Sequence, residues 1–100
     1  MQYKMDFDNK IFRLSKNVLK RYEPNIANGT YFLFDASNKN LWTGNYSTKI
    51  LLDLVDGYTE TKIIKNEFAK ILETTDIGAV NNSVNVIFSD LIEKDFLKEV

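Results

Sequence analysis

The spacing of apolar residues changes once along this chain, near residue 45. Before that point apolar residues come in short runs, at 18–22, 30–34 and 41–43. The first run mixes apolar with basic residues, as a strand with one face in water does. After residue 45 apolar residues recur every three or four positions, which is the period of an amphipathic helix. The pattern therefore predicts three strands followed by helices.

Polar connections between the runs predict an antiparallel meander. Pro24 is expected to end the first strand, because proline has no N–H for a ladder. Asn28-Gly29 predicts a tight hairpin turn, since both residues tolerate positive φ. A second polar turn covers 35–40. Three consecutive strands joined in this way pair as neighbours, which leaves the third strand at an edge of the sheet.

Three helices are expected in the second half of the chain. The first begins near Asn45 or Ser47, either of which can cap it, and Gly57 suits the left-handed position past its end. The second begins at Thr59 as a cap, and the third has a 3.6-residue period. Strands followed by helices are typical of the α+β class. The side chains expected to face the core are Ile50, Leu51, Leu54 and Val55, then Ile63, Ile64, Phe68, Ile71 and Leu72, and finally Val80, Val84, Ile87, Phe88, Leu91 and Ile92.

A length of 100 residues corresponds to one small domain. We predict an N-terminal arm over residues 1–16, ordered in part, and a domain over residues 17–100. Ile11, Phe12 and Leu14 of the arm could dock on the core, and Phe96 with Leu97 is expected to fold back onto it. No segment has a signal-peptide core or the length of a membrane span, so we expect a cytoplasmic protein with no membrane partner.

Composition removes most catalytic routes. The chain has no Cys and no His, which excludes disulfides, thiolate or imidazole catalysis and the common zinc and iron–sulfur sites. The carboxylates of Asp6, Asp8, Glu73 and Asp76 have no spacing that indicates acid–base work. We therefore predict no enzyme activity, no catalytic residue, no metal and no cofactor. A net charge of −1 gives no general attraction to polyanions.

Three features carry a resemblance to a known family. Asn45 opens a helix that ends Leu54-Val55-Asp56-Gly57, similar to an Asn-x-Thr start and a Leu-x-Asp-Gly finish. Thr59 with Ile63 and Ile64 opens the next helix. Val84, Phe88 and Leu91 precede Lys94-Asp95-Phe96-Leu97 at a matching spacing. From about residue 17 to 97 the chain thus resembles the PqqD-like domains, also called RiPP recognition elements.

The resemblance implies a winged helix-turn-helix-like fold that binds the leader of a ribosomally made precursor peptide. The leader would lie as an added strand beside the third strand, over the third helix. The domain would then present the precursor to a maturase, often a radical-SAM enzyme, which performs the reaction. In strand addition, main-chain hydrogen bonds give affinity and alternate side chains give specificity. An open edge could also pair with a second copy and form a homodimer.

The predicted site combines the third strand with the third helix. Trp42 is the first candidate anchor, because aromatic side chains are enriched at interfaces, although a lone Trp also often fills a small core. Core packing is the favoured interpretation of Val84 and Phe88, and it is balanced with peptide contact for Ile87 and Leu91. Asp56-Gly57 is interpreted as structural. The candidate peptide-binding residues are Lys39, Leu41, Trp42, Thr43, Val84, Ile87, Phe88 and Leu91.

Two other functions are alternatives to the adaptor. A winged-helix DNA-binding regulator needs Lys or Arg on its recognition helix for phosphates and base edges. No basic residue occurs from Ile71 through Glu93, so nucleic acid ranks well below a peptide as the partner. A structural subunit of a larger enzyme stays open as a third alternative.

Overall fold

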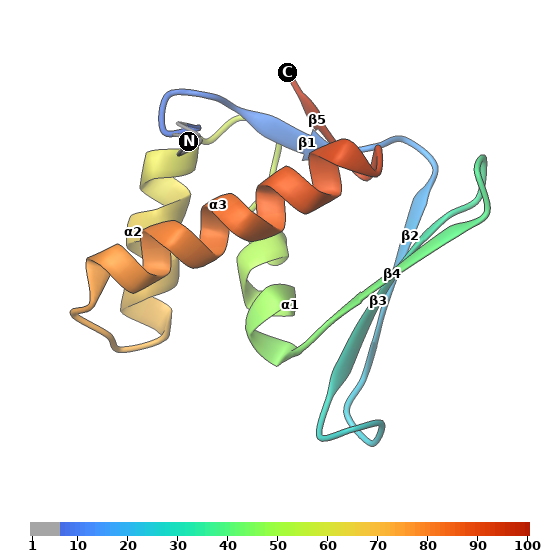
Figure 1. The fold of residues 1–100 in the computed structure, drawn as a ribbon, viewed down its shortest axis with the longest axis horizontal. Helices are drawn as coiled ribbons and strands as arrows, with labels where there is room; N and C mark the ends of the chain where they lie inside the picture. Colours follow the sequence, from blue (N-terminus) through green and yellow to red (C-terminus); the bar gives the residue numbers. More distant parts are fainter. Residues whose placement is uncertain (1–6) are drawn as a thin grey trace, which may run out of the picture.

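The fold is α+β, as predicted, and the computed structural model describes it for residues 7–100 (Figure 1). Strands β2, β3 and β4 form an antiparallel three-stranded sheet in that order, and β1 pairs with β5 in a separate two-stranded sheet. The meander and the three following helices are confirmed, whereas the two-stranded sheet was not predicted. The elements are β1 (Phe12–Leu14), β2 (Val18–Glu23), β3 (Thr30–Asp35), β4 (Asn40–Gly44), α1 (Tyr46–Asp53), α2 (Thr61–Ile71), α3 (Ile77–Glu93) and β5 (Leu97–Glu99).

Alternation along β3 gives the three-stranded sheet two different faces. Tyr31 and Leu33 are buried on one face, whereas Phe34, the next residue after Leu33, points to the opposite face and is 37% exposed. Leu33 pairs with Trp42 and Phe34 with Leu41, so Trp42 lies on the core face and Leu41 on the outer face. The helices stand on one side of this sheet, and its outer face is turned away from them (Figure 1).

The first connection of the sheet is longer than predicted. Glu23 pairs with Thr30, so residues 24–29 join β2 to β3 and no two-residue turn forms. Asn28 and Gly29 do adopt positive φ, at 62° and 112°, as expected of their residue types. The amide of Gly29 donates to the carbonyl of Ile26 at 2.8 Å, and this local bond closes the loop.

The step from β4 into α1 is fixed by a side-chain cap. Asn45 Oδ1 accepts hydrogen bonds from the backbone N–H of Thr48 at 3.0 Å and from its hydroxyl at 3.1 Å. Asn45, not Ser47, is therefore the N-cap. A Cβ on Gly44 would meet the Thr48 side chain at 2.8 Å, so the residue before the cap has no room for a side chain. These contacts set the direction in which α1 leaves the sheet.

The predicted boundary between α1 and α2 is wrong by a few residues. α1 has already ended when the chain reaches Gly57, which takes φ +81° within the connecting loop. Asp56 accepts hydrogen bonds there from the backbone N–H groups of Tyr58 and Thr59, and these bonds, the one from Tyr58 first, lower the pKa of its carboxyl. The Thr59 hydroxyl also donates to Asp56, so Thr59 belongs to this loop and Glu60 is the N-cap of α2.

One stripe of α3 occupies the centre of the core. Val84, Phe88 and Leu91 are 0% exposed, and their spacing puts them on one face of the helix. The rings of Phe88 and Phe12 pack edge to face with their centroids 5.6 Å apart, so the stripe packs against β1. Phe96 and Leu97 also fold back into this core, as predicted.

α2 lies at the periphery and buries a narrower stripe than expected. Ile64 and Phe68 face the core, but Ile63, Ile71 and Leu72 are 45%, 49% and 38% exposed. Their predicted burial is wrong because α2 has packing partners along one side only. An apolar period alone does not say how wide that side is.

The N-terminal segment is tied to the helices from residue 8 onward, and the first six residues of the predicted arm lie outside the described part. The buried ammonium group of Lys65 in α2 donates to Asp8 and to Asn81 of α3. The hydroxyl of Thr61 donates to the carbonyl of Lys10 at 2.8 Å. Residues 8–14 therefore belong to the same folded unit as the helices.

Replacing Asn45 with Ala removes both hydrogen bonds at the start of α1. We expect the Asn45→Ala variant to lose about 1 kcal/mol in the free energy of unfolding. Urea denaturation followed by circular dichroism measures the loss. Asn45→Asp is the matched control, because it keeps the acceptor oxygen and should stay within roughly 0.5 kcal/mol of the parent. Equal losses in the two variants would contradict the capping role.

Candidate functional site

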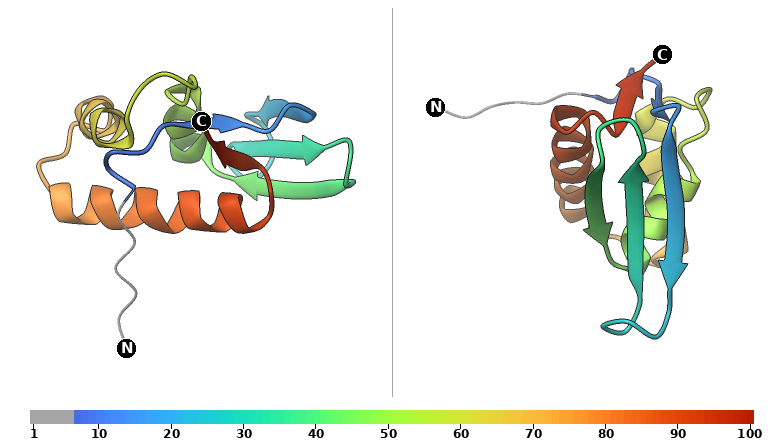
Figure 2. Two further views of the ribbon diagram at one scale, coloured as in Figure 1. Left: turned by 90° about the horizontal axis from the view of Figure 1, so that it is seen from above. Right: turned by 90° about the vertical axis from the view of Figure 1, so that its right-hand side faces the viewer.

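β4 is an edge strand, in the position that the meander predicted. It pairs with β3, and no strand of the described sheet lies on its other side. Alternate backbone N–H and C=O groups along Asn40–Gly44 therefore face away from the sheet, where an extended chain can pair with them. α3 runs beside this edge, so that β4 lies between β3 and α3 (Figure 2, right).

A side-chain hydrogen bond links the edge strand to α3. The indole N–H of Trp42 donates to Asp90 Oδ2 at 2.7 Å. Asp90 also pairs with Lys94, whose Nζ lies 3.0 Å from Oδ1. The bond from Trp42, followed by that from Lys94, lowers the pKa of the Asp90 carboxyl, so the bridge carries a negative charge at neutral pH. Trp42 is half-buried in this bridge and neither fills the core nor stands free in solvent.

The α3 face that borders β4 is adjacent to the core stripe. Ser83, Ile87 and Asp90 share it by their i, i+4, i+7 spacing, and the bond to Trp42 shows that it is turned toward the strand. Ile87 is half-buried there. Of the helix residues predicted for the site, Ile87 alone reaches this face.

The structure places Val84, Phe88 and Leu91 in the core. Each of these side chains is 0% exposed and contacts other parts of the chain, so a ligand on the surface cannot touch it without displacing the helix. This placement agrees with the core-packing interpretation of their helical spacing. Their contribution to the candidate site is to hold α3 beside β4.

The predicted strand residues do not all lie together. Trp42 points to the core face and toward α3, whereas Leu41 and Thr43 lie on the outer face by alternation. Lys39 precedes the strand and takes φ +57° in the turn, with its side chain exposed. Leu41, at 61% exposure, stands across from Phe34, so its apolar neighbours belong to the outer face and not to the α3 side.

A cleft of about 410 Å³ opens where β4 ends. Buried apolar side chains of α2 and α3 form its floor, including Phe68 and Val80, and polar groups form much of its rim. The remaining residues that line it are Asn45, Ser47, Thr48, Leu72, Thr74, Asp76, Ala79, Ser83 and Ile87. Because Asn45 directly follows β4 and Ile87 lies on the bordering face of α3, the cleft adjoins the strand edge.

Sequence reasoning missed Asp90 and most of the cleft. Asp90 carried a usable signal, because it is the first charged residue in a helix that is uncharged from Ile77 through Ser89, and it follows Ile87 by three positions. Leu72 carried a weaker sequence signal, since an apolar residue just past a helix end can cover a neighbouring pocket. The polar rim came with no signal, because its members meet only in the folded chain.

Comparison of the chain with models of known protein families, with curated proteins and with solved structures finds no match. Within residues 7–100 no helix has the length and apolar character needed to cross a membrane. In the same part of the chain, no group of three or more carboxylates is placed to hold a metal ion.

The lowered pKa of Asp90 predicts how stability depends on pH. A carboxyl whose folded-state pKa lies below its unfolded value of 3.8 stabilises the protein above that value, and the contribution is lost as the pH falls through the folded-state pKa. Asp90→Asn carries no charge to lose, so its free energy of unfolding should fall less between about pH 4 and pH 2.

The single tryptophan gives the measurement for this prediction, because Trp42 fluorescence follows both the bridge and unfolding. Urea unfolding is compared at each pH for the parent, for Asp90→Asn and for the control Glu93→Gln, which removes an exposed carboxylate from the same helix. Identical pH profiles for Asp90→Asn and the parent would contradict a stabilising role of the ionised bridge.

Proposed function

We propose that this chain is a non-catalytic adaptor that binds an extended peptide as a fourth strand on the open edge of β4. The observation that carries the proposal is the bridge from Trp42 to Asp90, which aligns that edge with a face of α3. Strand addition needs unpaired main-chain groups for affinity and neighbouring pockets for side chains. The edge offers the first, and the cleft beside Ile87 offers a pocket.

The geometry suggests how such a peptide would lie. Every strand pair in the described sheets is antiparallel, so we place the added strand antiparallel to β4, running from the Gly44 end to the Asn40 end. The five residues of β4 correspond to roughly 17 Å at about 3.4 Å per residue. A side chain near the start of the added strand would enter the cleft, and later ones on that side would pass over Trp42.

The resemblance to PqqD-like domains supports a particular partner. It favours the leader segment of a ribosomally made precursor as the peptide and a radical-SAM enzyme or another maturase as the recipient. In this proposal the adaptor contributes binding and orientation, and the maturase contributes the reaction. An edge that pairs by main-chain hydrogen bonds suits this division, because it leaves the core of the precursor free for the maturase.

The structure offers less support for a DNA-binding regulator. The face of α3 that points away from the core and from β4 carries Asn82, Val86 and Glu93, which are exposed and include no cation. A recognition helix without Lys or Arg lacks the charges that neutralise phosphates. The peptide is therefore the better-supported ligand.

A direct test is titration with fluorescently labelled leader peptides from precursors encoded beside this protein. We expect a Kd below about 100 μM, and we expect Ile87→Ala to raise it about fivefold to tenfold by removing an apolar contact of roughly 1 kcal/mol. Trp42→Phe should also weaken binding, because Phe cannot donate the hydrogen bond to Asp90. The variant keeps an aromatic ring at this position, so the loss reports on the hydrogen bond. Fluorescence anisotropy measures the Kd, and circular dichroism checks that each variant is folded.

Val86→Ala is the matched control, because Val86 precedes Ile87 but points into solvent at 61% exposure. Its Kd should equal that of the parent. No binding of any such leader below about 100 μM would contradict the adaptor proposal. A salt-sensitive shift with duplex DNA would favour the regulator instead.

A further inference from the structure

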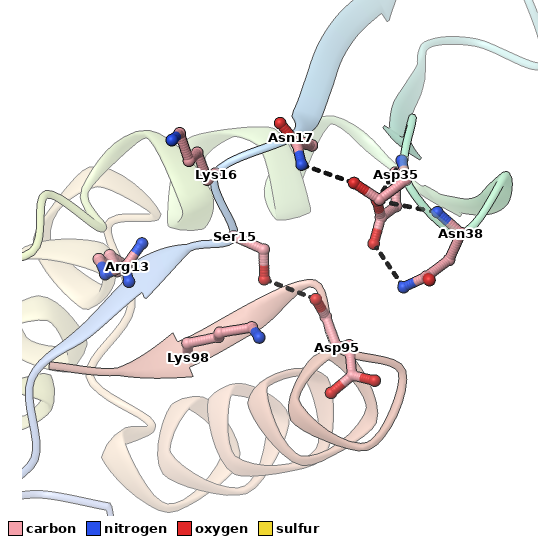
Figure 3. Close-up of a pocket in the computed structure, with 9 residues that line it drawn as sticks. Arg13, Ser15, Lys16, Asn17, Asp35, Asn38, Asp95 and Lys98 are labelled. Carbon is pink, nitrogen blue, oxygen red and sulfur yellow. Dashed lines mark hydrogen bonds between the residues drawn. The ribbon is translucent and has the colours of Figure 1, made fainter.

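A polar pocket lies between the two sheets, near the end of the molecule where β4 begins (Figure 3). Its volume is about 260 Å³. It is lined by β1 and the segment after it, by the turn between β3 and β4, and by the start of β5. Three of the lining side chains are cations, namely Arg13, Lys16 and Lys98.

These cations are placed at an electrostatic cost. Arg13 and Lys98 stand directly opposite each other in the β1–β5 ladder, and like charges in that position destabilise a strand pair. Within residues 7–100 neither they nor Lys16 has a salt bridge or side-chain hydrogen bond, whereas seven other Lys or Arg side chains form ion pairs. The pocket thus gathers three cations that have no ion-pair partner among the described residues.

The two carboxylates in the lining, Asp35 and Asp95, offset part of this charge but form no ion pair with the three cations. Asp35 is 4% exposed, and its oxygens accept hydrogen bonds from the backbone N–H groups of Ser37 and Asn38 and from the Asn38 amide. The carboxylate of Asp95 points away from the space between Ser15 and Asp35 (Figure 3). Arg13, Lys16 and Lys98 therefore remain available to an external anion.

We propose that this pocket binds a carboxylate of the extended peptide, with Arg13 and Lys98 as its ligands and Lys16 at its rim. The inference rests on the proposed function, because an acidic residue of the bound peptide supplies the carboxylate. The planar guanidinium of Arg13 can hold two carboxylate oxygens, and Lys98 adds a second positive charge. Binding would also relieve the repulsion between the two opposed cations.

The position of the pocket sets where the acidic residue falls. Asn38, in the pocket wall, precedes the first residue of β4 by two positions, so a peptide antiparallel to β4 reaches the pocket after it leaves Asn40. Its apolar side chain would enter the cleft at the opposite end of the strand. The acidic residue should therefore follow that apolar residue by roughly five to eight positions, given about 3.4 Å per residue.

A double-mutant cycle tests the contact. Two peptides are used: the leader peptide that binds in the titration above, and a version whose acidic residue at this spacing is changed to its amide. The Kd of each peptide is measured with the parent protein and with the Arg13→Gln/Lys98→Gln double variant. We expect the amide peptide to bind the parent about tenfold more weakly, and the double variant to bind both peptides alike. Lys62→Gln/Lys70→Gln is the matched control, because it removes the same charge from α2 and should keep the tenfold difference.

Thermal unfolding excludes loss of the fold as the cause, since the double variant lacks the opposed cations and its midpoint should not fall below that of the parent. A peptide that binds the parent with no coupling in the cycle would overturn the carboxylate site and leave the adaptor function standing. Failure of every leader to bind would overturn both. A third outcome is that inorganic phosphate binds the pocket while the acidic and amide peptides bind the parent equally well. This outcome would assign the site to a free anion and overturn the proposal that it binds a peptide carboxylate.

Discussion

Burial of one stripe of α3 is the constraint on which the rest of the structure depends. Val84, Phe88 and Leu91 are fully enclosed, and Phe88 meets Phe12 of β1. Removing a buried Phe side chain typically costs about 3–5 kcal/mol, so the rotation of α3 about its own axis is strongly determined. The neighbouring face of the helix, with Ile87 and Asp90, is thereby presented to β4. The candidate site inherits its geometry from the core.

The bridge between Trp42 and Asp90 converts that packing into a shaped edge. An isolated edge strand invites pairing with any extended chain, and proteins usually cover or charge such strands. Here an ionised carboxylate and an indole stand beside the edge, with an apolar cleft at one end of β4 and three cations near the other. A ligand that pairs with the main chain must also suit these groups, which gives a main-chain interaction its selectivity.

The separation of the two sheets has a consequence for the proposed carboxylate site. β1 reaches the core through Phe12, yet its next residue, Arg13, faces Lys98 across the ladder. Alternation makes this unavoidable, because consecutive side chains of a strand point to opposite faces. The burial of Phe12 that stabilises the core therefore also exposes Arg13 beside Lys98. An anion in the pocket would stabilise an arrangement that the core imposes.

Apolar period and turn chemistry determine much of this protein by themselves. They specify the three strands, the edge position of the third, a helix cap at Asn45 or Ser47 and three helices, because each depends on residues close together in the chain. The boundaries around Asp56 and the width of the α2 stripe escape them, since Thr59 and Leu72 obtain their roles from neighbours. The pairing of β1 with β5 and the bond from Trp42 to Asp90 join residues far apart in sequence. Only the tertiary structure decides such contacts, because packing of the whole core sets which face of α3 meets β4.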